Sequence, residues 1–230
     1  MYILDNNIQS LVLLAISAYI VILIYRHVRY KRSTYYRITK KSYRSLDTGD
    51  FGEYLIYSNL KKCEKNGGKF LFNLYIPNSN GGTTEIDVLL ISHNGVFLFE
   101  SKNFSGWIFG HQQQKYWTQS LPVGKGYESV KTQFYNPIWQ NAGHKANLER
   151  IIDTPIYSVV VFSDECTFRN VTITTDDVSV VHYKDLESFV FDSCTHKESD
   201  LLTQRDIERI YTQLYPYTQT DLETKERHKK

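Results

Sequence analysis

The chain has few cysteines, and none of them has the spacing typical of a metal-binding or disulfide-rich domain. Its 230 residues contain three cysteines, at Cys63, Cys166 and Cys194. No C-x-x-C pair is present, and an odd number of thiols cannot pair completely, which argues against a structural zinc site and against a disulfide framework. We therefore expect a protein of a reducing compartment.

Other features are also missing from the sequence. We find no internal repeat, no glycine-rich phosphate loop and no appended helicase, kinase or zinc module. The composition, with 41% hydrophobic and 23% charged residues, is that of an ordinary globular protein rather than a disordered one.

Charge is absent from residues 6–25, and residues 11–24 are almost wholly apolar. Twenty helical residues span roughly 30 Å, enough to cross the hydrocarbon core of a bilayer. The apolar character extends all around the helix, unlike that of a soluble surface helix. Basic residues follow this segment, whereas a cleaved signal peptide carries them in front. We predict a transmembrane helix at residues 6–25, with the N-terminus outside and the C-terminal domain cytoplasmic.

Basic residues are concentrated directly after this segment. Residues 1–45 carry eight lysines and arginines and one acidic residue, Asp5. Because the whole chain has a net charge of +2, residues 46–230 carry a net charge of −5. We interpret residues 26–46 as a basic juxtamembrane linker that sets topology; binding of anionic lipid or nucleic acid is the alternative. The acidic body alone is not expected to bind duplexes strongly without bridging metal or local basic clusters.

Two apolar runs with charged ends form the most informative part of the body. Glu85 and Asp87 lie on one face of a predicted strand, and Glu100 and Lys102 lie on one face of the next. Residues 93–95, His-Asn-Gly, have the composition of a hairpin turn. The hairpin would bring three carboxylates and an ammonium group to one edge of a buried sheet. Unpaired charge in such a place usually holds a metal ion or performs chemistry.

At these positions the sequence resembles the nuclease-related domain, NERD, a branch of the PD-(D/E)xK restriction-endonuclease-like superfamily. The resemblance covers roughly residues 47–163. It rests on an ordered set of motifs: Gly52-Glu53, Glu85-Ile-Asp87, residues 95–106 from Gly95 to Gly106, Trp117-Thr-Gln119 and Asn136-Pro137-Ile-Trp-Gln140-Asn141. It implies an α/β fold with a restriction-endonuclease-like mixed central sheet flanked by helices.

Phosphodiester hydrolysis requires charge neutralisation, a deprotonated water and a stabilised leaving oxygen, and divalent cations supply all three. Mg²⁺ or Mn²⁺ favours oxygen ligands and keeps several waters. We therefore predict Asp87 and Glu100 as metal ligands, with the Ser101 carbonyl as a further ligand. Lys102 would position the attacking water and stabilise developing charge.

The resemblance adds three positions to the predicted site. It implies that Glu53 completes the acidic set, and that Gln119 and Gln140 orient substrate or water. Each predicted residue has a structural alternative: Lys102 could form a plain salt bridge at the rim of the sheet. Gln140 could be a surface glutamine, Glu85 a solvated strand end and His144 an ordinary helix-face histidine. Trp107, Trp117 and Trp139 are interpreted as core or rim packing residues rather than base-stacking platforms.

The remaining pattern alternates helices and strands. We expect helices from 47 to about 66, at 136–152, at 184–191 and from Thr203, and strands at 69–76, 104–109, 115–119, 156–163 and 178–182. Residues 121–135 are expected to form a loop. The predicted domains are the nuclease-like domain at 47–163, an extension packing on it at 164–215 and a polar tail at 216–230.

Two functional hypotheses remain. The first is a membrane-anchored, metal-dependent nuclease, with DNA favoured over RNA as substrate. The second is a catalytically inactive nuclease-like module that recruits nucleic acid or a protein partner to the membrane; the sequence does not identify such a partner.

Overall fold

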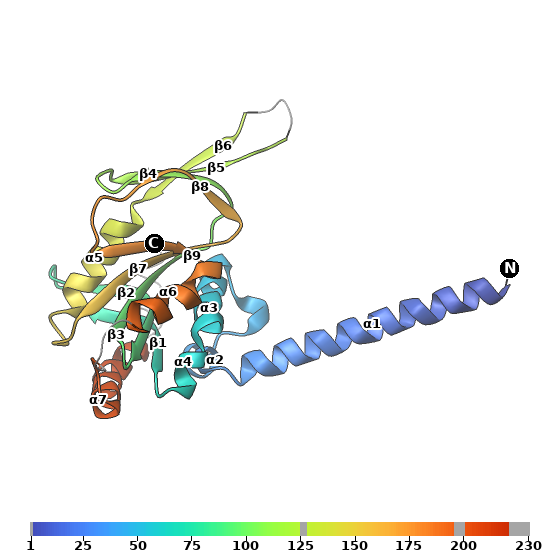
Figure 1. Ribbon diagram of the computed structural model, residues 1–230, viewed down its shortest axis with the longest axis horizontal. Coiled ribbons are helices and arrows are strands. Elements are labelled where there is room, and N and C mark those ends of the chain that lie inside the picture. Colours follow the sequence, from blue (N-terminus) through green and yellow to red (C-terminus); the bar gives the residue numbers. More distant parts are fainter. Residues whose placement is uncertain (1, 125–127, 196–200, 221–230) are drawn as a thin grey trace. The chain divides into compact units, whose positions relative to one another are not determined.

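Two units make up the chain in the computed structural model, Met1–Ser45 and Leu46–Lys230. The structure describes residues 2–124, 128–195 and 201–220 (Figure 1).

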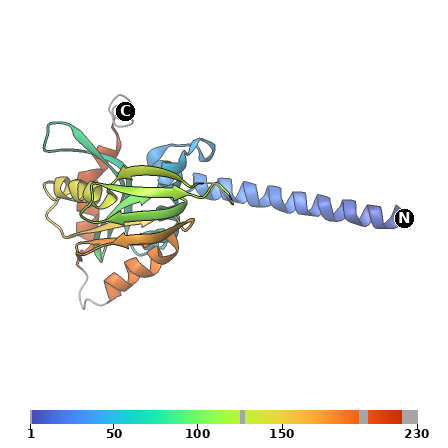
Figure 2. The same cartoon turned by 90° about the horizontal axis from the view of Figure 1, so that it is seen from above.

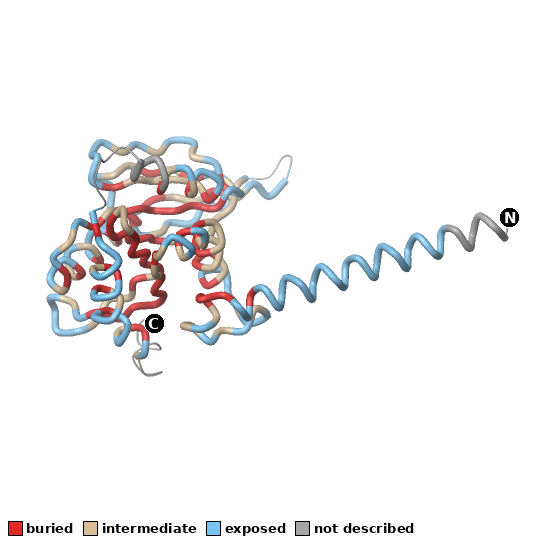
Figure 3. Tube along the Cα trace, turned by 60° about the horizontal axis from the view of Figure 1, so that its bottom comes forward, coloured by how far each residue is buried: buried red, intermediate tan, exposed pale blue. Residues whose placement is uncertain are grey.

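The first unit is built on one long helix, α1 (Tyr2–Lys31). Within its segment Ile8–Lys31, the most apolar 18-residue window has a mean hydropathy of 2.3 and no buried residue (Figure 3). This helix is long and apolar enough to cross a membrane, a property that signal sequences share. It continues about six residues beyond the predicted segment 6–25.

Aromatic packing organises the basic residues that follow α1. A short helix, α2 (Thr34–Thr39), and a 3₁₀ turn, η1 (Tyr43–Ser45), come next. The Tyr30 ring lies 5.1 Å from the Tyr43 ring, and its hydroxyl donates to the Lys41 carbonyl over 2.7 Å. The predicted basic linker at 26–46 therefore begins inside α1, and its later residues Lys41 and Tyr43 fold back onto the end of that helix.

The second unit is a mixed α/β domain, which confirms the predicted fold class, and it contains a second sheet beside the predicted central one. The first sheet has the order β1-β2-β3-β7-β9. Its strands are β1 (Lys69–Pro77), β2 (Thr83–Ser92), β3 (Gly95–Lys102), β7 (Ile156–Phe162) and β9 (Val178–His182). β1, β2 and β3 pair antiparallel, and β3, β7 and β9 pair parallel.

The second sheet has the order β6-β5-β4-β8 and is seen face on in Figure 2. It consists of β4 (Gly106–His111), β5 (Tyr116–Leu121), β6 (Val130–Tyr135) and β8 (Cys166–Thr172). β6 lies in the predicted loop 121–135, and β8 was not predicted. Both strands are largely exposed, so they lack the apolar pattern by which a strand is recognised in sequence.

The hairpin and the helix starts agree with the sequence analysis. Ser92 pairs with Gly95 across the turn. Asn136 accepts from the Ile138 amide and caps α5 (Pro137–Leu148), which ends four residues earlier than expected. Thr203 and Asp206 form a capping box on α7 (Gln204–Leu214). β7 is almost fully buried between two parallel strands, as its continuous apolar sequence indicates.

Helices cover the first sheet on both faces. α3 (Thr48–Leu60) packs on β2 and β3 and against α6 (Tyr183–Thr195), and α5 packs on β3 and β7. The expected first helix is divided, since α4 (Lys62–Lys65) follows α3 as a separate turn. The chain then passes from α7 into η2 (Tyr215–Thr218), which packs on β1, so it is ordered beyond the predicted start of the tail. Residues 221–230 of that tail lie outside the described residues.

The inner face of the second sheet packs on β7 through aromatic rings. Trp117 and Phe162 are fully buried and stack with centroids 6.1 Å apart. Gly110 lies above Trp117, where a Cβ atom would be 2.1 Å from Cδ2 of the ring. The absence of a side chain at Gly110 is therefore required for this packing.

Replacing Gly110 by Ala should destabilise the domain, because overpacking a buried site usually costs about 1–3 kcal/mol. Gly143 is the matched control: a Cβ atom there meets nothing within 4 Å. Gly143→Ala should stabilise α5 by up to about 1 kcal/mol. Urea unfolding of the detergent-solubilised chain measures both effects, and equal effects of the two substitutions would contradict this packing.

Candidate functional site

The first sheet opens at Asp87. Pairing between β1 and β2 runs through Phe72 and Val88 and resumes at Leu74 and Ile86, which leaves Asp87 outside the ladder. Pairing between β2 and β3 also stops at Val88. The Asp87 carboxylate accepts a hydrogen bond from the Ser101 amide at 3.0 Å. A carboxylate therefore takes the place of a backbone acceptor where the strands separate.

Glu100 and Lys102 form an ion pair beside this opening. Lys102 Nζ lies 2.7 Å from Glu100 Oε1, and the two side chains are 16% and 2% exposed. Lys102 Nζ also donates to Gln140 Oε1 at 3.2 Å. The structure thus brings the predicted residues Asp87, Glu100, Lys102 and Gln140 together.

α5 is held against the sheet by Asn141. Its buried amide donates to Ser158 Oγ at 2.9 Å and to the Leu98 carbonyl at 3.3 Å. Residues one turn apart on a helix share a face, and so Gln140 and His144 both reach the carboxylate cluster. His144 Nε2 lies 3.4 Å from Glu100 Oε2, and Nδ1 lies 2.8 Å from Thr84 Oγ1.

His144 is more closely involved than the sequence analysis expected, since it is 7% exposed and faces Glu100. The contact between Nε2 and Oε2 is close enough for an ion pair with a protonated imidazole, but both atoms lack a hydrogen bond. The signal in the sequence is that His144 follows Gln140 by four residues on a capped helix, and the packing of α5 turns that spacing into a contact with Glu100.

Glu53 reaches the site through a residue that the sequence analysis missed. Asn73 Nδ2 donates to Glu53 Oε1 at 3.1 Å and to Glu85 Oε1 at 3.3 Å. Asn73 has φ of 50° in the middle of β1, a left-handed conformation that asparagine tolerates better than most residues. Glu85 also accepts from the Tyr75 hydroxyl at 2.6 Å, so it is not simply the solvated strand end that was expected.

Ser101 points to the opposite face from Glu100, toward α3 and α6. Its hydroxyl lies 3.2 Å from the Tyr183 hydroxyl. A Cβ atom on Gly52 would lie 2.4 Å from Ser101 Oγ, so this glycine permits the close approach of α3 to β3. The approach brings Glu53, the next residue, to the sheet.

Gln119 is not part of the cluster. Its side-chain amide donates to the Ser105 carbonyl at 2.9 Å, and no hydrogen bond connects it with Asp87, Glu100 or Lys102 within residues 2–124, 128–195 and 201–220. Among the tryptophans, Trp117 is a core residue as expected, whereas Trp107 and Trp139 are 37% and 40% exposed.

The two central carboxyl groups titrate differently. Burial and the negative charge of Glu100 raise the pKa of Asp87 from 3.8 to about 7. Burial also acts to raise the pKa of Glu100, but Lys102 and His144 outweigh it and hold that pKa below its usual value. Burial opposes the charge of Lys102, yet Glu100 and Asp87 raise its pKa. At neutral pH the cluster has an ionised Glu100, a charged Lys102 and an Asp87 close to its titration point.

The donor set suits a hard cation with few protein ligands. Glu100 Oε2 is buried without a hydrogen bond, and a cation would offset the burial and the repulsion from Glu100 that together raise the Asp87 pKa. Within the described part of the chain, no three His, Cys, Asp or Glu side chains converge on a common metal position. Asp87 and Glu100 would therefore hold the ion with waters, as Mg²⁺ sites often do.

Replacing Asp87 by Asn should stabilise the metal-free protein at neutral pH. Between about pH 4 and pH 7 the folded state binds more protons at Asp87 than the unfolded state, so the free energy of unfolding falls as pH rises through this range. The cost of ionising Asp87 in the folded state is about 1.4 kcal/mol for each unit by which its pKa is raised. Asn does not ionise, so the variant avoids this cost.

Urea unfolding in EDTA over a pH series measures the difference between this variant and the wild type. The difference should grow from about pH 4 to pH 7 and then level off. Asp153→Asn, at an exposed position, should show no such growth. An Asp87→Asn variant that is less stable than the wild type at every pH would contradict this electrostatic description.

Comparison with known proteins identifies the family of this chain. The sequence model of the nuclease-related domain, NERD, matches residues 48–163. An uncharacterized protein of Bacillus anthracis is 30% identical over 185 residues, which are 79% of this chain and 82% of the relative. No solved structure matches the chain. The predicted resemblance is confirmed, and its placement in the PD-(D/E)xK superfamily is consistent with the match. The chain therefore belongs to the nuclease-related domain family.

Proposed function

We propose that the protein is a membrane-anchored nuclease that hydrolyses phosphodiester bonds in DNA with Mg²⁺ or Mn²⁺. Family membership implies a nuclease-like function and nucleic-acid binding. The observation that carries the proposal is the convergence of Asp87, Glu100, Lys102 and Gln140 where the strands separate.

Asp87 and Glu100 would hold the metal ion. When bound, the ion would neutralise phosphate charge and lower the pKa of a bound water. Loading should release the Asp87 proton, because a metal ligand must be deprotonated and the pKa of this carboxyl is about 7. Metal affinity should therefore rise as pH increases through 7.

Lys102 keeps its charge in a largely buried position, because neighbouring carboxylates raise its pKa. Such an ammonium group can stabilise negative charge that develops on the phosphate. Gln140 Oε1, which accepts from Lys102, and His144 border the same space, so they can orient water or substrate. Glu53 supports the edge of the site through Asn73.

A second candidate function is a non-catalytic binding module at the membrane. The short Lys102–Glu100 ion pair and the lack of a third converging acidic or histidine ligand among the described residues favour it. Calorimetry with Mg²⁺ separates the two functions. Binding by the wild type that is lost in Asp87→Asn supports the nuclease, and equal binding or none supports the binding module.

Plasmid DNA should be nicked in the presence of Mg²⁺ or Mn²⁺ by the full chain in detergent. Lys102→Ala should lower the rate at least about 100-fold, the usual cost of removing a group that stabilises developing charge. Lys62→Ala is the matched control, since Lys62 forms an ion pair of the same 2.7 Å length with Glu187 at the exposed surface.

Asp87→Asn provides the second arm of this experiment. It should abolish cleavage while raising stability in EDTA, a combination that misfolding cannot produce. Cleavage that survives both Lys102→Ala and Asp87→Asn would refute the assigned site.

The anchor is α1, with its N-terminus outside and the domain in the cytoplasm. The basic residues of 26–44 immediately follow the apolar segment, and such residues remain on the cytoplasmic side. Added protease should therefore digest residues 46–230 in inside-out membrane vesicles and spare them in right-side-out vesicles. The reverse pattern, or release of the protein by alkaline carbonate, would overturn this topology.

A further inference from the structure

The outer face of the second sheet carries aromatic rings in contact with solvent. Ile108 and Trp117 point inward to the core, and their neighbours Trp107 and Tyr116 point outward. Trp107 is 37% exposed and Tyr116 is 48% exposed. Tyr135 on β6 is 43% exposed, and its ring lies 6.3 Å from that of Tyr116. Large rings are thus displayed on the solvent side of three adjacent strands.

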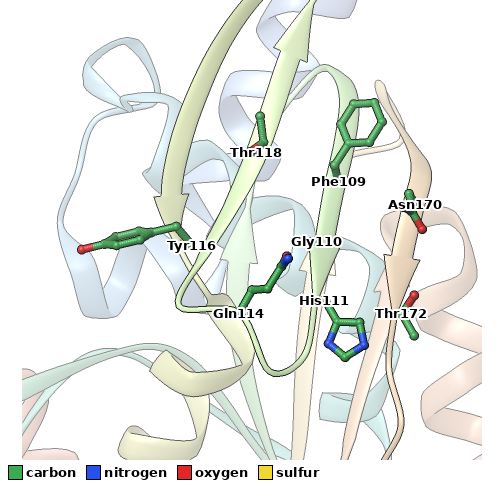
Figure 4. Close-up of a pocket in the computed structure, with 8 residues that line it drawn as sticks. All are labelled: Phe109, Gly110, His111, Gln114, Tyr116, Thr118, Asn170 and Thr172. Carbon is green, nitrogen blue, oxygen red and sulfur yellow. The ribbon is translucent and has the colours of Figure 1, made fainter.

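A pocket of about 290 Å³ lies among these strands (Figure 4). Its wall is mixed, with two aromatic rings and several uncharged polar side chains: Phe109, Gly110, His111, Gln114, Tyr116, Thr118, Asn170 and Thr172. Figure 4 shows the Gln114 side chain extending across the hairpin toward Gly110. Apolar ring surface combined with neutral donors and acceptors suits a flat heterocycle such as a nucleobase.

The rim of this pocket is firmly held. The carbonyl of Gln112 accepts from Asn136 Nδ2 at 2.9 Å and from Trp139 Nε1 at 2.8 Å. Its side chain accepts from the Thr174 amide at 2.8 Å. The turn between β4 and β5 is thereby tied to α5 and to the segment after β8, so the pocket is largely pre-formed.

Charge on this sheet differs from charge on the rest of the domain. The four strands contain no aspartate or glutamate, although residues 46–230 carry a net charge of −5. The acidic residues nearest in sequence, Glu128 and Glu165, lie in connecting loops. Arg169 lies 5.0 Å from the Trp107 ring centroid, and Lys115 Nζ lies 5.4 Å from that of Tyr116. Trp107 and Tyr116 therefore each have a cation over the ring.

We propose that this face binds single-stranded nucleic acid, with bases stacked on Tyr116 and Trp107 and one base in the pocket. Stacking rings that alternate with cations are the usual features of such platforms. Paired bases within a duplex do not offer their faces to side chains, so the ligand is unpaired. The inference rests on the proposed function, because it specifies the form of nucleic acid that reaches the Asp87 site.

Fluorescence anisotropy with a labelled short oligothymidine tests this surface, with an abasic oligomer of equal length as the base-free probe. The full chain in detergent, in EDTA, should bind oligothymidine several-fold more tightly than the abasic oligomer. Tyr116→Ala and Trp107→Ala should each weaken oligothymidine binding about fivefold or more and leave abasic binding unchanged. Arg169→Gln should weaken both, because it removes a phosphate contact.

Tyr215→Ala is the matched control, since Tyr215 is a 37% exposed aromatic outside the second sheet; it should change neither affinity. Equal binding of the two oligomers, or oligothymidine binding that is unaffected by Tyr116→Ala and Trp107→Ala, would overturn the proposal. Binding measured in EDTA separates this outcome from failure of the nuclease assignment, because it requires no metal ion. Oligothymidine binding with these effects, in a protein that does not nick plasmid DNA, would support this surface and refute only the nuclease.

Discussion

The site depends on one electrostatic constraint: the carboxylates of Asp87 and Glu100 share a single, largely buried ammonium group, that of Lys102. Lys102 neutralises Glu100 at 2.7 Å, whereas burial and the negative charge of Glu100 raise the pKa of Asp87 to about 7. Folding alone gains nothing from this arrangement, because apolar residues could fill the same space without the electrostatic cost. The surrounding structure maintains it nevertheless: Asn141 fixes α5, Gly52 admits α3, and the Ser101 amide holds Asp87. Local instability of this kind is common where binding or chemistry takes place.

Alternation along strands and helix capping were sufficient to predict the centre of the site. Asp87, Glu100 and Lys102 follow from the two-residue period of strands joined by a short turn, and α5 follows from Asn136 and Pro137. Gln140 was placed by family resemblance and does contact Lys102. Gln119 was placed in the same way, but its side chain bonds to Ser105 instead. The metal ion and the catalytic roles remain predictions.

What could not be predicted depends on distant contacts. Nothing in the sequence around Asn73 indicates its left-handed backbone conformation or its hydrogen bonds to Glu53 and Glu85. β6 and β8 have exposed, polar sequences, and they form strands because they pair with β5 and β4. A lone histidine on a helix is usually a surface residue, and only the packing of α5 places His144 beside Glu100.

The two-residue connection between β2 and β3 has a consequence for how the family can vary. Residues 93 and 94 separate the paired Ser92 and Gly95, and this spacing sets the register that ends at Val88 and Phe99, the residues next to Asp87 and Glu100. One inserted residue in the turn that shifted the pairing by a single step would rotate one carboxylate to the far side of the sheet. Length changes should therefore accumulate in homologues at residues 78–82 or 122–129, and the turn at 93–94 should keep a constant length.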